Sequence, residues 1–192
     1  MIRICVLGGI GAGKSFLAKS FGYPVFNADT EVSKIYKNNK LCFLKLKKVF
    51  SKHITSFPIQ KREILNIILA NKTNIKKINK VVHPIIQKKM KNFLKKYKNK
   101  KIVVLDIPLL LENKINTKDD ILVFIYPDRK GAFKRLKKRK NFNLELFKKF
   151  RKIQLPLEFK KKKSQFVVKN DFTKTSLKKS VKRILRKILS ND

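Results

Sequence analysis

Residues 8–15 are Gly-Gly-Ile-Gly-Ala-Gly-Lys-Ser, a glycine-rich stretch that ends in an amine and a hydroxyl. This spacing fits the phosphate-binding loop at every fixed position. Its glycines let backbone N–H groups turn toward a phosphate chain, Lys14 reaches the outer phosphates, and Ser15 is a hydroxyl ligand for Mg²⁺. A glycine-rich turn with a chance lysine is the alternative. The apolar run before the loop and the helix-like segment after it favour nucleotide binding.

Two carboxylates follow apolar runs, as expected of acids at the ends of buried strands. The run 101–106 ends in Asp106, which could hold magnesium beside the loop serine or could instead cap a following helix. The segment 23–29 is predicted to form a short second strand ending in Asp29, which could accept the proton of an acceptor hydroxyl. Ligands gather at the carboxyl ends of parallel strands, so both acids are expected on the side of the phosphate loop.

Three further side chains could serve the same chemistry. Arg135 and Arg139 have four-residue spacing, so they could face a phosphate chain together or form an ordinary solvated helix face. His83 precedes Pro84, and this pair is predicted to break a helical region. On local grounds His83 is more often a helix-end residue than a ligand.

The elements that must position these residues alternate between strands and helices. Strands are predicted at 2–7, 23–29, 101–106, 121–126 and 165–169, which favours an α/β fold with a five-stranded parallel sheet. Residues 41–99 are predicted to be mostly helical and are too long for a simple crossover, so a substrate-holding subdomain is their natural use. A lysine-rich turn is predicted at 160–163, and an amphipathic helix from Thr173 to the C-terminal end.

The chain of 192 residues is 43% apolar and has a formal net charge of +38. Such a charge raises the possibility of an ATP-dependent nucleic-acid-binding protein. However, 8 of the 50 basic residues are arginines, which leaves 42 lysines spread over nearly every predicted helix, without any known nucleic-acid-binding motif. We therefore expect loose polyanion binding at low salt, attraction of anionic substrates, and no specific nucleic-acid partner.

Other classes are disfavoured by what the sequence lacks. It has neither a membrane-length apolar stretch nor a signal segment, so we expect a cytoplasmic protein with no membrane partner. We separately expect a monomer. Cys5 and Cys42 have no metal-like spacing and are expected to be buried thiols. The absence of an Asn-Lys-x-Asp guanine-binding motif argues against a switch GTPase and leaves a small-molecule kinase.

Taken in order, the motifs resemble those of the dephospho-CoA kinase family over essentially the whole chain. The shared motifs are the loop at 8–15, Asn27-Ala28-Asp29, Val82-His83-Pro84, Asp106-Ile107-Pro108-Leu109-Leu110-Leu111-Glu112, Arg135-Leu136-Lys137-Lys138-Arg139, Gln154, and Val167-Val168-Lys169-Asn170. The resemblance implies ATP-dependent phosphorylation of the ribose 3′-hydroxyl of dephospho-CoA, the last step of coenzyme A synthesis. It also implies the three-layer fold of the nucleoside monophosphate kinases.

The same resemblance implies an organisation and a set of site residues. The core would comprise 1–29, 101–133 and 164–192, with a helical acceptor-binding insertion at 30–100 and a lid at 134–163. Lys14, Asp29 and Arg139 would be catalytic, with Asp29 as the base, and Ser15 and Asp106 would hold Mg²⁺. The acceptor would contact Asp29, His83, Pro108, Leu109 and Glu112. ATP would contact Gly9, Ile10, Gly11, Ala12, Gly13, Lys14, Ser15, Phe16, Arg135, Arg139 and Asn170.

The chain departs from the family pattern at four places. Asn27 replaces the first acid of Asp-Ala-Asp, Ser33 and Phe150 replace basic residues, and Phe16 replaces a threonine. These changes remove no core part of the mechanism, but they leave open a kinase of another small hydroxyl acceptor, such as a nucleoside.

Overall fold

The computed structural model describes residues 1–192 apart from 72, 128–132, 134, 139–141 and 191–192. The chain forms two compact units. The first comprises Met1–Asn27, Tyr97–Asn143 and Phe150–Asp192, and the second comprises Ala28–Lys96 and Leu144–Lys149.

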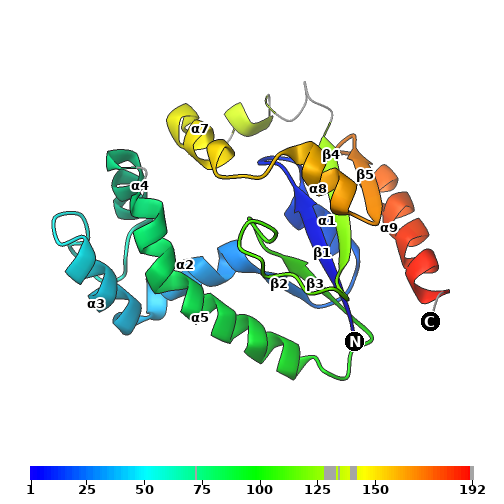
Figure 1. The fold of residues 1–192 in the computed structure, drawn as a ribbon, viewed down its shortest axis with the longest axis horizontal. Helices are drawn as coiled ribbons and strands as arrows, with labels where there is room; N and C mark the ends of the chain where they lie inside the picture. Colours follow the sequence, from blue (N-terminus) through cyan, green and yellow to red (C-terminus); the bar gives the residue numbers. More distant parts are fainter. Residues whose placement is uncertain (72, 128–132, 134, 139–141, 191–192) are drawn as a thin grey trace. The chain divides into compact units, whose positions relative to one another are not determined.

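The first unit is built on one sheet of five parallel strands, which confirms the predicted fold class (Figure 1). The strand order is β2-β3-β1-β4-β5, so the first strand in sequence is central. Its inner strands are almost continuously buried, as expected when helices cover both faces of a parallel sheet. The strands are β1 (Ile2–Gly8), β2 (Val25–Asn27), β3 (Ile102–Asp106), β4 (Ile121–Pro127) and β5 (Phe166–Asn170).

The helices α1 (Lys14–Ser20) and α9 (Lys174–Leu189) contact each other and the sheet. The helix α9 is amphipathic, and its apolar side chains, Leu177 and Ile184 among them, enter a buried cluster with side chains of α1 and the strands. The helix α8 (Leu157–Lys163) contacts β1 and β4, and Figure 1 shows it on the other side of the sheet from α1. The sequence predicted a turn at 160–163, which is wrong, because these lysines form the last turn of α8.

The carboxyl ends of the strands meet along one edge of the sheet. The register pairs Asn27 with Asp106 and Gly8 with Ile125, so the phosphate loop leaves the sheet at the edge where β2 and β3 end. The predicted second strand is too long, because β2 ends at Asn27. Asp29 lies instead in the first turn of the next helix.

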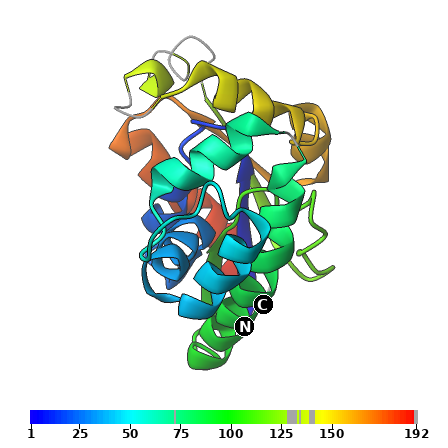
Figure 2. The same ribbon diagram turned by 90° about the vertical axis from the view of Figure 1, so that its left-hand side faces the viewer.

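The second unit is helical and is organised around one long helix (Figure 2). It contains α2 (Ala28–Asn38), α3 (Lys40–Val49), α4 (Lys61–Ala70) and α5 (Asn74–Lys96), and α5 packs against the other three. The first part of α7 (Leu144–Lys152) also belongs to this unit.

The helix α5 continues through Pro84, so the predicted break at His83-Pro84 is wrong. Proline removes one helical hydrogen bond and crowds the preceding turn. On either side of it, however, Ile78, Val82 and Ile86 repeat every four residues and are buried. The packing of this continuous apolar stripe offsets the local penalty of the proline.

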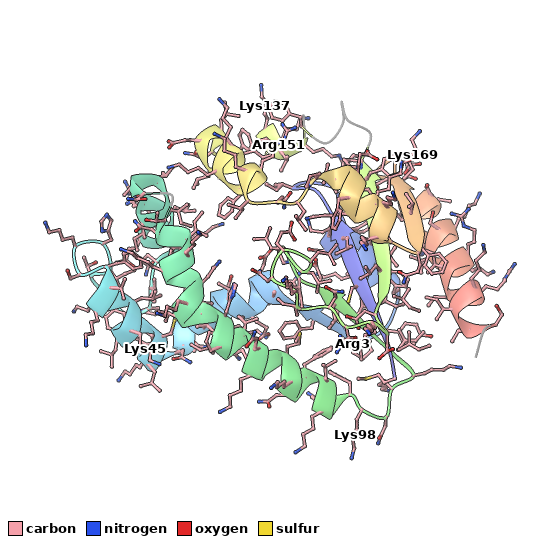
Figure 3. All side chains as sticks on the ribbon, in the orientation of Figure 1. Arg3, Lys45, Lys98, Lys137, Arg151 and Lys169 are labelled. Carbon is pink, nitrogen blue, oxygen red and sulfur yellow. The ribbon has the colours of Figure 1, made fainter. Side chains whose placement is uncertain are left out.

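At the edge of the sheet where the strands begin, close to Arg3 in Figure 3, a buried carboxylate joins β1 to the start of β4. Asp120 accepts hydrogen bonds from Arg3 Nε and Nη2, and from the backbone N–H and hydroxyl of Thr117. Burial by itself would raise the pKa of Asp120, but the bonds from Arg3 and Thr117 outweigh it and hold that pKa below its ordinary value. The cluster is structural, because it lies at the opposite strand ends from the phosphate loop.

Both cysteines are buried free thiols, as predicted from their spacing. Burial raises the pKa of Cys42 to about 11, so its thiol stays protonated at neutral pH. Among the described residues, no helix is long and apolar enough to cross a membrane.

Candidate active site

The phosphate loop connects β1 to α1, and its glycines hold conformations that side chains would disturb. Gly11 and Gly13 have φ values of 78° and 96°, in the left-handed region. A Cβ on Gly11 would meet the Leu136 side chain at 2.7 Å, and one on Gly13 would collide with the Asn170 amide. Between them, Ala12 N donates a hydrogen bond of 3.2 Å to Gly9 O, which tightens the turn.

Lys14 begins α1 and its side chain folds back over the loop. Its ammonium donates to Gly8 O at 3.1 Å and to Gly9 O at 2.9 Å. These carbonyls hold the cation at the mouth of the loop. Ile10 lies half-buried in the turn of the loop, and Phe16 is 44% exposed on the first turn of α1.

Three polar side chains from three elements meet beside the loop. Asn27, at the end of β2, donates a short hydrogen bond to Asp106 Oδ2 and a longer one of 3.4 Å to Ser15 Oγ. Asp106 ends β3 and is 2% exposed. The structure therefore brings Ser15 and Asp106 together, with Asn27 bridging them.

This group suits a hard divalent cation that keeps much of its hydration. A serine hydroxyl and a carboxylate are oxygen ligands of the kind that Mg²⁺ uses, with the remaining positions left to water and phosphate. In the described part of the chain, no three His, Cys, Asp or Glu side chains gather as a complete protein cage would require. The donor set thus fits a magnesium ion shared with a nucleotide.

Asn170 links the end of β5 to the phosphate loop. It is 1% exposed, and its Nδ2 donates to Ala12 O at 2.8 Å while its Oδ1 accepts from Phe172 N at 2.8 Å. The ring of Phe172 lies 4.3 Å from the guanidinium carbon of Arg135. Arg135 and Asn170 are therefore near one another, whereas Arg139 lies outside the described residues.

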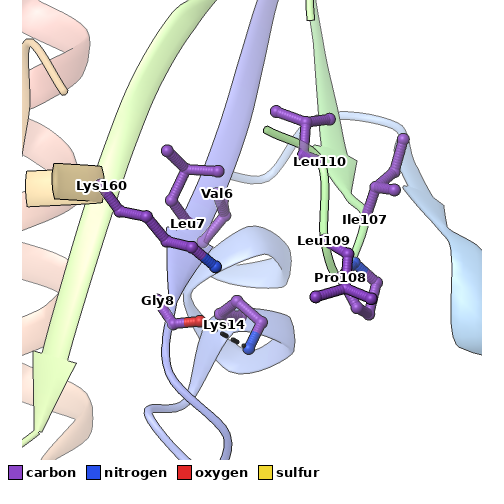
Figure 4. A pocket seen from close by; sticks show the side chains of 9 residues that line it. All are labelled: Val6, Leu7, Gly8, Lys14, Ile107, Pro108, Leu109, Leu110 and Lys160. Carbon is purple, nitrogen blue, oxygen red and sulfur yellow. Dashed lines mark hydrogen bonds between the residues drawn. The ribbon is translucent and has the colours of Figure 1, made fainter. Parts of the chain in front are cut away.

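The turn after β3 lies close to the phosphate loop, and the two line one pocket. Pro108 and Leu109 line a small pocket together with Gly8 and Lys14 (Figure 4). Leu109 has a φ of 59°, an uncommon conformation for a side chain of this kind. Glu112 lies beyond the pocket lining, and its carboxylate pairs with Lys160 of α8.

Two of the predicted residues belong to the second unit. Asp29 is exposed in the first turn of α2, and its backbone carbonyl accepts a hydrogen bond of 2.9 Å from Ser33 Oγ. His83 is half-buried on α5, and burial lowers the pKa of its imidazole, which is therefore neutral at pH 7.

Sequence reasoning missed Lys160, Leu157 and Phe172. The sequence offered no signal for Lys160, which is one of four consecutive lysines. Leu157 would contact a Cβ on Gly9 at 3.5 Å, so α8 covers the loop. For Phe172 the signal was its place two residues after Asn170, where the chain turns with a φ of 66°.

A parallel α/β sheet, a glycine-rich loop after its central strand, and a serine and an aspartate beside that loop define a P-loop phosphotransferase. Comparison with known protein families shows which kind of phosphotransferase this is. The dephospho-CoA kinase family model matches residues 2–176. The chain therefore belongs to the dephospho-CoA kinase family.

Individual relatives agree with the family model. The chain is 34% identical over 187 residues to the dephospho-CoA kinase of Wolbachia sp. subsp. Brugia malayi, with 95% of each chain covered. It is 29% identical over 193 residues to that of Bacillus anthracis, covering 97% of this chain and 96% of the relative.

Solved structures of other proteins have a similar fold. TT1252 from Thermus thermophilus superposes with a TM-score of 0.78 at 25% identity, covering 97% of each chain. Dephospho-CoA kinase from Campylobacter jejuni gives a TM-score of 0.62 at 26% identity over 97% of this chain and 96% of that one. A shikimate kinase from Acinetobacter baumannii, with a TM-score of 0.53 at 14% identity over 100% of this chain and 95% of that one, shows a similarity of fold alone.

Proposed function

We propose that this chain transfers the γ-phosphoryl group of ATP to the ribose 3′-hydroxyl of dephospho-CoA, giving ADP and coenzyme A. The observation that carries the proposal is the meeting of Lys14, Ser15 and Asp106 at the phosphate loop of a chain in this family. Phosphoryl transfer needs mainly positioning and electrostatic stabilisation, which a loop, a cation and an oriented acceptor supply.

In this proposal the first unit holds the nucleotide. The N–H groups of residues 9–16 and the ammonium of Lys14 bind the outer phosphates, and Asn170 lies near the adenine. Ser15 and Asp106 hold Mg²⁺, which would neutralise charge on the phosphate oxygens. The hydrogen bond from Asn27 supports this role, because it fixes the Asp106 carboxylate toward the loop serine.

The acceptor side of the proposal rests on Asp29 and His83, with Pro108 and Leu109. Asp29 is the general base that removes the proton of the 3′-hydroxyl. Its exposure supports this role, since an exposed carboxylate is accessible to a substrate hydroxyl. A neutral His83 supports hydrogen bonding to the acceptor, because a neutral imidazole carries both a donor and an acceptor nitrogen.

We also propose a role for each segment of the chain. Segments 1–29, 101–133 and 164–192 form the core, 30–100 the acceptor-binding insertion, and 134–163 the lid that brings Arg135 and Arg139 to the transferring phosphoryl group. The cation–π contact of Arg135 with Phe172 supports a place for this arginine near the nucleotide. The backbone N–H of Phe172 donates a hydrogen bond to Asn170, the residue proposed to lie near the adenine.

The test is an acceptor comparison. The protein is incubated with ATP and Mg²⁺ together with dephospho-CoA, with adenosine, or without an acceptor, and both ADP and the phosphorylated product are measured. Turnover that requires dephospho-CoA and yields coenzyme A is expected. Turnover with adenosine alone, or equal ADP release without an acceptor, would contradict the proposed acceptor.

A further inference from the structure

One lysine of the basic run at the end of α8 is buried. The helix ends in four consecutive lysines, of which Lys161, Lys162 and Lys163 are exposed, whereas the side chain of Lys160 is 3% exposed. An ammonium is rarely buried unless an anion is paired with it. The general abundance of lysine in this chain does not account for burying this one.

The partner of Lys160 is a carboxylate from a distant part of the sequence. Glu112 Oε1 lies 2.6 Å from Lys160 Nζ, and the glutamate side chain is 10% exposed. The same oxygen accepts a hydrogen bond of 2.9 Å from Leu155 N. Its Oε2 is buried and accepts no hydrogen bond from the part of the chain that the structure describes. Glu112 thereby holds both α8 and the segment before it.

The ion pair is oriented with respect to the phosphate loop. Lys160 lines the same pocket as Lys14, Gly8, Pro108 and Leu109, whereas Glu112 is not part of that lining. Figure 4 shows the Lys160 side chain reaching the pocket from α8, with its nitrogen on the side of Lys14. The positive end of the pair thus lines the pocket, whereas the negative end is not part of the lining.

We propose that Lys160 is a second phosphate-binding lysine of this pocket, and that Glu112 is the positioning residue that permits its burial and aims it. The ligand is an outer phosphate group of the bound nucleotide. The ammonium has three donors, of which Glu112 Oε1 takes one, so the others can reach phosphate oxygens. This inference deepens the proposed function and rests on ATP being the donor.

The informative variant removes both charges while it keeps the packing. In the double variant Lys160→Met with Glu112→Gln, the glutamine retains an oxygen for Leu155 N, and neither charge is left buried alone. Lys162→Met is the matched control, because it removes one exposed charge from the same helix. Lys160→Arg keeps a cation. Thermal unfolding, kcat/KM, and the Kd values for ATP and for adenosine are measured on each full-length protein.

We expect the double variant to fold and to bind ATP at least ten-fold more weakly, with its affinity for adenosine unchanged. Lys162→Met should bind ATP as tightly as the parent, and Lys160→Arg should retain most of the ATP affinity. A folded double variant that binds ATP as tightly as the parent would show that the pair is only structural and would overturn the proposal.

A measurement on the parent keeps the proposal testable if the double variant does not fold. The ¹⁵N signal of the Lys160 ammonium, assigned by its loss in Lys160→Arg, should shift on addition of ATP and not of adenosine. An unmoved signal at saturating ATP contradicts the proposal. Neither binding readout needs the acceptor, so failure to phosphorylate dephospho-CoA would contradict the proposed function alone.

Discussion

Replacing Asp106 with asparagine should separate the stability of this protein from its activity. Asp106 is 2% exposed and receives a hydrogen bond from the neutral amide of Asn27. Among the ion pairs of the described residues, none involves Asp106. Placing a carboxylate in a buried position beside a neutral partner costs free energy, so we expect this side chain to lower the stability of the apo protein.

The size of the effect follows from two opposing contributions. Burying a charge costs several kcal/mol even after relaxation, whereas a hydrogen bond to a charged group returns about 1.5–3 kcal/mol. An asparagine at this position can keep a hydrogen bond with Asn27 and removes the charge. The net expectation for Asp106→Asn is a gain of about 1–2 kcal/mol, which for a chain of this size raises the Tm by roughly 2–8 °C.

The assay is thermal unfolding followed by circular dichroism, together with turnover. Without magnesium, the variant should unfold at a higher temperature than the parent. ATP with Mg²⁺ should stabilise the parent more than ATP with a chelator, and the variant equally in both, because ligands stabilise only the state that binds them. Turnover should fall by about 10²-fold or more. A lower Tm without magnesium, or an unchanged magnesium effect in the variant, would refute the reasoning.

Three other substitutions test separate parts of the structure. Asp29→Asn should lower kcat by about 10²–10⁴-fold, as expected for a lost general base, and leave the Kd for ATP unchanged in calorimetry. Asp120→Asn should reduce the free energy of unfolding by about 1–3 kcal/mol at pH 7, because the Arg3 guanidinium, whose side chain is 19% exposed, loses its charged partner. Gly13→Ala should raise the KM for ATP and lower stability by about 1–3 kcal/mol, since the new Cβ is strained at a φ of 96° and displaces Asn170.

The pH dependence of the Asp120 contribution has a definite sign. Because the pKa of Asp120 is lowered on folding, its contribution is complete above the unfolded value of about 3.9 and disappears as pH falls through the lower folded value. Denaturant midpoints of the parent should therefore drop on acidification through this range, and those of Asp120→Asn should change less.

Each of these predictions has a control or an outcome that would contradict it. Asp119→Asn is the matched control for both carboxylate substitutions, because Asp119 is an exposed neighbour of Asp120. Full turnover of Asp29→Asn would remove Asp29 as the base. Equal stability of Asp119→Asn and Asp120→Asn would mean that the ion pair of Asp120 with Arg3 contributes little. A Gly13→Ala protein with normal ATP kinetics would show that the loop tolerates a side chain there.

The amino-acid sequence by itself determined the phosphate loop, the five parallel strands and the burial of both cysteines. These features depend on local information: glycines where the backbone must turn tightly, and apolar runs of strand length between helical segments. The same local rules failed at Pro84, where burial of Val82 and Ile86 on one continuous helix outweighs the proline penalty.

Only the tertiary structure decided which polar groups meet. It placed the end of β2 at Asn27 and brought that amide between Ser15 and Asp106. It also buried Lys160, alone among four consecutive lysines, and paired it with Glu112, 48 residues earlier in the sequence. The energy of a charge depends on its removal from water and on its nearest partner, and both are set by packing between segments remote in sequence. No local pattern carries that information.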